Sequence, residues 1–101
     1  MKLLTSVVFA SAVALSGQAL AADAAAGKAA YAAKGCIGCH GANGVAVVPT
    51  YPTLKGKDAA FVKQNLTDFR SGKRVGTTMN AMAAGLSDAD IENLAAYISG
   101  F

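Results

Sequence analysis

The sequence predicts an all-α domain, because three segments carry helix signals and the stretches between them are marked by glycine and proline. Each of the three segments has either apolar residues three and four positions apart or a run of alanine, the best helix former. No segment shows the alternation of apolar and polar residues that is typical of a half-buried strand. The chain has 101 residues, which is the length of one domain.

Residues 1–21 are expected to be a signal peptide that is cleaved and takes no part in the fold. Lys2 makes the start positive, residues 3–15 form an uncharged apolar run, and residues 19–21 (Ala-Leu-Ala) match the small-x-small pattern cut by signal peptidase. The apolar run is shorter than the about 20 residues that cross a bilayer, so no stable membrane span is expected after cleavage. We therefore expect residues 22–101 to form an exported domain located in the periplasm.

The first two predicted helices cover residues 23–34 and 58–71. Asp23 is a suitable N-cap for the first helix, and Gly35 is suited to end it. The second helix has an apolar stripe at helical spacing. The stripe consists of Phe61, Val62, Leu66 and Phe69.

The third predicted helix has the clearest start in the chain and ends before Gly100. Ser87 is the expected N-cap, and Asp90 stands where a capping box places Glu or Gln. Leu86 and Ile91 are spaced to pack across this cap as a hydrophobic staple. These local signals predict a helix that begins at residue 87.

Two loops separate the predicted helices. Residues 41–56 contain three glycines and both prolines of the chain, which is incompatible with a continuous helix. Residues 73–85 are also expected to be a loop, and they contain Met79 and Met82, the only methionines besides the initiator. The loop placement leaves both thioethers available for binding.

Composition and charge argue against a nucleic-acid-binding protein and a membrane protein. The formal net charge is +3, but the lysines and arginines do not form a polybasic run. Much of the hydrophobicity comes from the first 21 residues and from alanine. We therefore expect no nucleic-acid partner.

The sequence Cys36-Ile37-Gly38-Cys39-His40 matches Cys-x-x-Cys-His, the attachment signature of c-type haem. Two thiols one helical turn apart reach the two vinyl groups of the porphyrin, and His40 is then directed to the iron as the proximal ligand. A domain this small buries little surface, so covalent attachment explains how it retains a cofactor. The motif predicts one covalently attached haem c.

Three other uses of this cysteine pair agree less well with the sequence. A thioredoxin-like redox pair requires a preceding strand and a parallel sheet. A structural zinc site needs four ligands, whereas His40 is the only histidine and there is no third cysteine. A disulfide between Cys36 and Cys39 would close too small a loop to stabilise the domain much.

The second axial position of the iron is expected to be filled by Met79 or Met82. Electron-transfer haems pair His with Met, and the thioether raises the reduction potential. Because His40 is the only histidine, ligation by two histidines of one chain is excluded. A lysine or an open site is the remaining alternative, and the residues alone leave the choice between the methionines open.

Several stretches beyond the haem motif resemble class I c-type cytochromes, namely the small periplasmic monohaem members and each half of their dihaem relatives. The resemblance covers essentially all of residues 22–101. It implies the class I cytochrome c fold, with three main helices around one covalently bound haem. The similar stretches are residues 39–44, 48–54, 68–74 and 79–88.

The resemblance also implies roles for single residues. In this family a proline carbonyl accepts a hydrogen bond from the proximal histidine, and Pro49 matches by position, with Pro52 as the second choice. Relatives with a Met-x-x-Met arrangement ligate through the first methionine, which favours Met79 over Met82. The N- and C-terminal helices of the family cross closely. The residues expected at that crossing are Gly27, Tyr31, Leu94 and Tyr97.

The expected function is that of a soluble one-electron carrier and not of an enzyme. The expected partners are redox proteins of a respiratory chain, such as a reductase, an oxidase or another cytochrome, and the expected state is a monomer. The alternative is a haem protein with an open distal site that acts as a small peroxidase or a gas-binding sensor. The sequence shows neither a distal His or Arg pocket nor an effector domain for that alternative.

Overall fold

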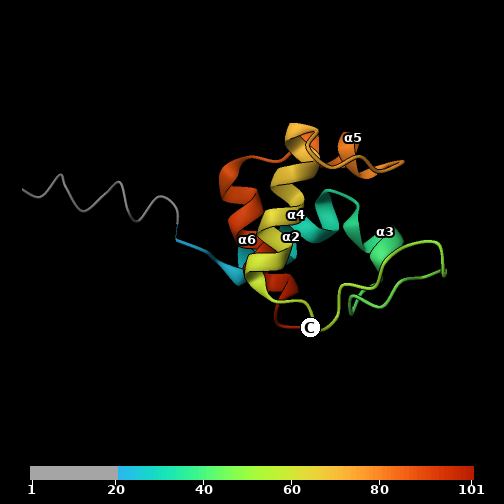
Figure 1. Ribbon diagram of the computed structural model, residues 1–101. Coiled ribbons are helices and arrows are strands. Elements are labelled where there is room, and N and C mark those ends of the chain that lie inside the picture. The colour runs from blue at the N-terminus through green and yellow to red at the C-terminus, as the bar shows by residue number, and fades with distance from the viewer. Residues whose placement is uncertain (1–20) are drawn as a thin grey trace, which may run out of the picture.

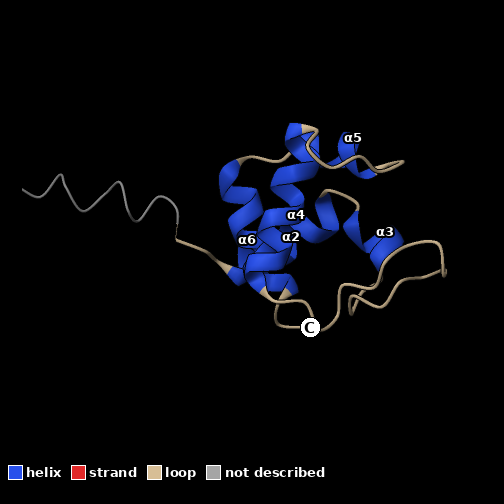
Figure 2. Ribbon diagram, viewed as in Figure 1, coloured by secondary structure: helices blue, strands red, loops and turns tan. Residues whose placement is uncertain are grey.

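The computed structural model describes residues 21–101, and in this range every regular element is a helix. The prediction of an all-α fold is therefore confirmed (Figure 2). The predicted signal peptide, apart from Ala21, lies outside the described residues. The helices are α2 (Ala24–Ala33), α3 (Cys36–His40), α4 (Ala59–Ser71), α5 (Met79–Ala84) and α6 (Asp88–Ile98).

Helices α2 and α6 begin at the caps that the sequence predicts, and α4 follows Asp58, the residue at which the sequence places its start. The Asp23 carboxylate accepts hydrogen bonds from the backbone of Ala25 and Ala26 at the start of α2. At the start of α6, Ser87 and Asp90 form a complete capping box, with both side chain–backbone bonds at 3.0 Å. These caps satisfy backbone N–H groups that have no partner within the helix.

Of the two short helices, α3 and α5, only α5 differs from the sequence-based expectation. Residues 79–84 form α5, so the prediction of a continuous loop over residues 73–85 is wrong there. A helix of five or six residues is too short to show an apolar period and is not stable alone in water. Both helices therefore depend on contacts with the rest of the molecule.

The core lies where α2 and α6 cross, as expected from the family resemblance. A Cβ atom on Gly27 would overlap the carbonyl oxygen of Asn93 and lie 2.8 Å from Cβ of Tyr97, so only glycine permits this approach. Leu94 and Tyr31 are fully buried beside it. The ring of Tyr31 also packs edge-to-face against Tyr97 and Phe101, with centroids 5.5 and 5.4 Å apart. Such aromatic pairs stabilise beyond the area they bury.

Figure 1 shows how this core positions the remaining elements. Helices α2, α4 and α6 group together, while α3 and residues 41–57 extend to one side and α5 lies above them. Within the described range, no helix is both long and apolar enough to span a bilayer. The haem motif lies on α3 and the two methionines lie on α5, so the short helices beside the packed core carry these groups.

Candidate functional site

Helix α3 consists of the five motif residues alone. Cys36 and Cys39 are three positions apart in one helical turn, so their side chains share a face of the helix. Both thiols are partly buried, and no disulfide joins them. Burial raises the pKa of the Cys36 thiol. The chain thus presents two neighbouring thiols at the spacing that haem attachment requires.

His40 is buried and held in a defined orientation. Its exposed fraction is 7%, and its Nδ1 lies 2.9 Å from the carbonyl oxygen of Pro52. Because a carbonyl only accepts hydrogen bonds, Nδ1 carries the proton and donates it. The other ring nitrogen, Nε2, then has a lone pair available for a metal ion.

The partner of His40 corrects the expectation for Pro49. Pro49 follows Val48 in a tight turn, in which the Tyr51 N–H donates to the Val48 carbonyl at 3.2 Å. Proline suits this turn position because its φ angle is already that of the turn. The chain has reversed direction by Pro52, so the second choice is the carbonyl that meets the histidine.

The residue after His40 is anchored by a contact that the sequence did not reveal. Gly41 has a φ of 81°, and a Cβ atom there would overlap the Val45 carbonyl. The hydroxyl of Tyr31 donates to the Gly41 carbonyl at 2.7 Å. Burial, with smaller contributions from Cys36 and Tyr97, raises the pKa of Tyr31 to about 12, so this hydroxyl stays protonated at neutral pH.

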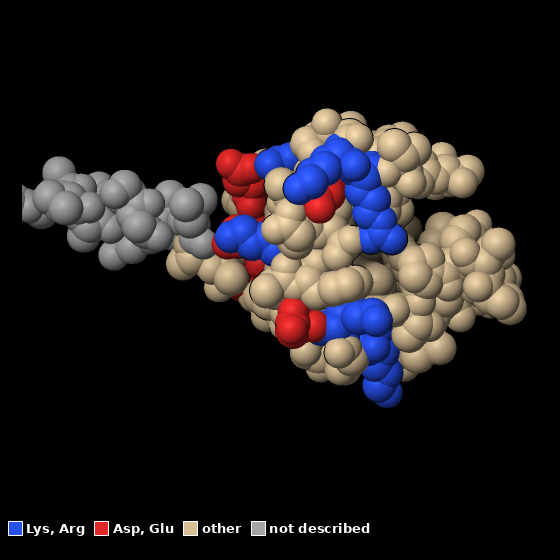
Figure 3. Space-filling model, in the orientation of Figure 1, with Lys and Arg blue, Asp and Glu red and all other residues tan. Residues whose placement is uncertain are grey.

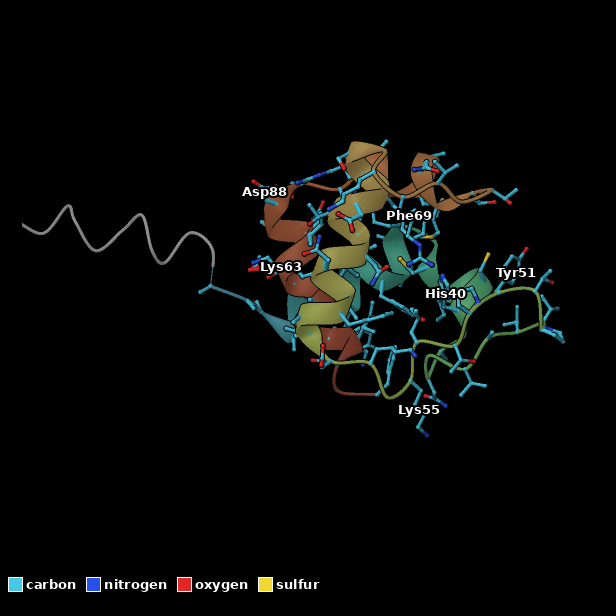
Figure 4. All side chains as sticks on the ribbon, in the orientation of Figure 1. His40, Tyr51, Lys55, Lys63, Phe69 and Asp88 are labelled. Carbon is cyan, nitrogen blue, oxygen red and sulfur yellow. The ribbon has the colours of Figure 1, made fainter. Side chains whose placement is uncertain are left out.

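Two adjoining cavities of about 470 and 360 Å³ lie beside the motif. Their lining is mainly apolar, as in most cofactor sites. His40 on α3 and Phe69 on α4 both border this space (Figure 4). The residues that border both cavities are Cys36, His40, Pro52, Leu66, Phe69, Arg74 and Met79.

The two methionines of α5 occupy different places at this space. Met79 borders both cavities, whereas Met82 borders only the larger one. The methyl group of Met82 lies 3.4 Å from the position of a Cβ atom on Gly35, at the turn between α2 and α3. Met79 therefore shares both cavities with Cys36 and His40, whereas Met82 shares only one.

The rim of the cavities is uncharged on one side and basic on the other. Residues 35–54 contain no charged side chain, and Figure 3 shows a broad uncharged surface beside the hollow in this face. On the other side, Arg74 borders both cavities, with its guanidinium 4.7 Å from the centroid of Phe69 and hydrogen-bonded to Asn65.

These residues fit haem c and do not fit zinc. The paired thiols, the oriented imidazole and the apolar cavity are the groups that covalent haem requires. Across residues 21–101, no three His, Cys, Asp or Glu side chains gather in a way that could hold a metal ion. The donor set is thus one imidazole and two thioethers beside two thiols.

Comparisons with known proteins agree with this geometry. The family model "Cytochrome c" matches residues 24–101. Cytochrome c-554(548) of Halomonas halodenitrificans is 43% identical over 54 residues, which are 50% of this chain and 65% of that protein. Cytochrome c4 of Stutzerimonas stutzeri is 48% identical over 54 residues, which are 50% of this chain and 26% of that protein.

A solved structure of cytochrome c4 from Acidithiobacillus ferrooxidans superposes with a TM-score of 0.71 at 34% identity. The superposition covers 79% of this chain and 50% of that one. The chain thus spans less than two thirds of the length of each of these relatives. The chain belongs to the cytochrome c family, has the class I cytochrome c fold, and carries the motif by which this family attaches haem c through Cys36 and Cys39.

Proposed function

We propose that this protein is a one-electron carrier with a single haem c ligated by His40 and Met79. The observation that carries the proposal is that both cysteines, His40 and Met79 border one cavity, with Nε2 of His40 available for the iron. Bound haem c supplies an iron centre that gains or loses one electron. The related cytochrome c4 of known structure is described as an electron-transfer protein, which supports the same role here.

The chain's own residues have three tasks in this function. Cys36 and Cys39 hold the cofactor covalently, so retention does not depend on the small core. The Pro52 carbonyl fixes the ring of His40 and increases its basicity. Leu66 and Phe69 keep water away from the iron, which favours a defined pair of ligands in both redox states.

Export to the periplasm and brief docking with redox proteins complete the proposal. Residues 1–21 act as the cleaved leader, and the mature domain is residues 22–101. The uncharged segment beside the motif exposes Val45, Val47 and Val48, which gives a partner a surface without charges to desolvate. Transient redox complexes use small interfaces of this kind, and a monomer is sufficient for them.

Single substitutions of the two methionines test the ligand assignment. In the ferric holoprotein, Met79→Ala should abolish the weak far-red absorption band that arises from the bond between sulfur and iron. It should also lower the midpoint potential, because the thioether favours ferrous iron. Met82→Ala is the matched control and should retain both properties. Optical spectra and redox titrations measure the effect.

Two results would contradict the proposal. Retention of the far-red band in Met79→Ala together with its loss in Met82→Ala would show that Met82 is the ligand. A high-spin ferric spectrum of the unmodified protein, with rapid binding of small ligands, would instead favour the peroxidase or gas-sensing function.

A further inference from the structure

Asn80, the residue directly after Met79, uses its side-chain amide in three hydrogen bonds to the backbone. Its Oδ1 accepts from the Gly76 N–H at 2.8 Å. Its Nδ2 donates to the carbonyl of Phe69 at 2.9 Å and to that of Arg74 at 2.8 Å. The amide orientation follows from these partners, because the reversed amide would place donor against donor and acceptor against acceptor.

These bonds join three parts of the chain that surround Met79. Phe69 lies in the last turns of α4, Arg74 and Gly76 lie in the irregular segment that follows, and Asn80 lies in the first turn of α5. A Cβ atom on Gly76 would be 3.7 Å from Cβ of Met79, so the bonded segment passes directly beside the methionine. The side chain of Asn80 therefore determines where α5 begins relative to α4.

Helix α5 packs against α4, and Ala83 near its C-terminal end is fully buried, but its start lacks the local support that the other helices have. It has six residues, which is too short for a stable independent helix. Its N-cap, Thr78, makes no side-chain capping bond, in contrast to Asp58 and Ser87 at the starts of α4 and α6. The position of Met79 thus depends on bonds made across space, and Asn80 supplies three of them.

We infer that Asn80 is a positioning residue for the methionine ligand, which it holds against the cavity by fixing the first turn of α5 to the end of α4. This inference rests on the proposed haem ligation and adds a named residue to it. Without the amide, α5 separates more readily from α4, and the methionine leaves the iron more often. An added small ligand then competes with the methionine more successfully.

The test is an imidazole titration of the ferric holoprotein and of its Asn80→Ala variant. The loss of the far-red band is the signal that reports imidazole binding. We expect the affinity for imidazole to rise about tenfold, which corresponds to about 1.4 kcal/mol. Asn93→Ala is the matched control, because it also removes an asparagine hydrogen bond, from the Asp23 N–H at 2.9 Å, but at the crossing of α2 and α6. The control should retain the imidazole affinity of the unmodified protein.

Asn80→Asp distinguishes the hydrogen bond that the amide accepts from the two that it donates. It also remains informative if the Asn80→Ala variant fails to fold with haem attached. It keeps an acceptor for Gly76 but loses both donated bonds and places a carboxylate beside two carbonyls. Hydrogen exchange of the Gly76 N–H should therefore stay slow in Asn80→Asp and become fast in Asn80→Ala. Both variants should bind imidazole more tightly than the unmodified protein.

The inference would be overturned if the Asn80 variants that fold with haem attached bind imidazole with an affinity within twofold of that of the unmodified protein. It would also be overturned if the imidazole affinity rose equally in Asn93→Ala. The outcome is independent of which methionine is the ligand, because α5 carries both. An error in the ligand assignment would appear in the spectra of Met79→Ala and Met82→Ala instead.

Discussion

The crossing of α2 and α6 and the wall of the haem cavity are held by different kinds of contact. The crossing is close-packed, with Gly27 against the Asn93 carbonyl and three aromatic rings in edge-to-face contact. The cavity wall instead depends on single polar groups: Pro52 orients His40, Tyr31 anchors Gly41, and Asn80 joins α5 to α4. Packing supplies most of the stability of a domain, whereas one hydrogen bond contributes little to it but restricts geometry.

Tyr31 belongs to both regions. Its ring is part of the packed crossing, and its hydroxyl reaches the backbone beside the proximal histidine. Substitutions at the crossing should therefore change the free energy of unfolding and leave the haem spectrum unchanged. Substitutions at the cavity wall should change properties of the haem site, such as its spectrum or its affinity for imidazole.

Gly27→Ala is expected to have the largest effect on stability among these substitutions. The added methyl group must separate α2 from α6, and such overpacking lowers the free energy of unfolding by about 2 kcal/mol. Denaturant titration of the holoprotein measures the change. Lys28→Ala, at the exposed next position, is the control, and an equal effect in both variants would contradict the close approach.

Tyr31→Phe should have a smaller effect, because it keeps the ring and removes only the hydroxyl. The buried Gly41 carbonyl then loses its partner, which lowers the free energy of unfolding by about 1.5 kcal/mol at neutral pH. Tyr97→Phe is the control, since Tyr97 is in the same aromatic cluster without that bond.

The effect of Tyr31→Phe should depend on pH. Folding raises the pKa of Tyr31 from 10.0 to about 12, so the unfolded chain ionises first as the pH rises. The stability linked to this hydroxyl is therefore complete below pH 10 and is lost between about pH 10 and pH 12. The difference between the unmodified protein and Tyr31→Phe should narrow over that interval, and a constant difference would contradict the raised pKa.

Lys63→Ala should have the smallest effect, because it removes a surface ion pair with Glu92 at 2.8 Å. The lysine side chain is 58% exposed and points away from the cavity (Figure 4). Pairs of this kind contribute about 0.5 kcal/mol or less and are weakened by salt. Thermal unfolding at low and high salt measures the change, and a loss above 1 kcal/mol would mean that the ion pair between α4 and α6 stabilises the domain more than expected.

The parts of the fold that follow from local chemistry were predictable from the sequence. Asp23 and Ser87 cap helices through bonds to residues two or three positions away, so their neighbours in sequence are sufficient to identify them. The spacing of Cys36 and Cys39 likewise lies within one helical turn, and the motif alone predicted the haem. The single histidine and the absence of a third cysteine likewise argued against a zinc site, because structural zinc needs four ligands.

The arrangement of the cavity wall was decided by tertiary structure. The proline that meets His40 is Pro52 and not Pro49, because a turn at residues 48–51 reverses the loop between them. At the start of α5, Asn80 bonds to backbone groups that are four to eleven positions earlier in the chain. Short-range patterns in a sequence report capping and spacing, whereas these contacts depend on how the loop and α5 fold back onto the packed helices.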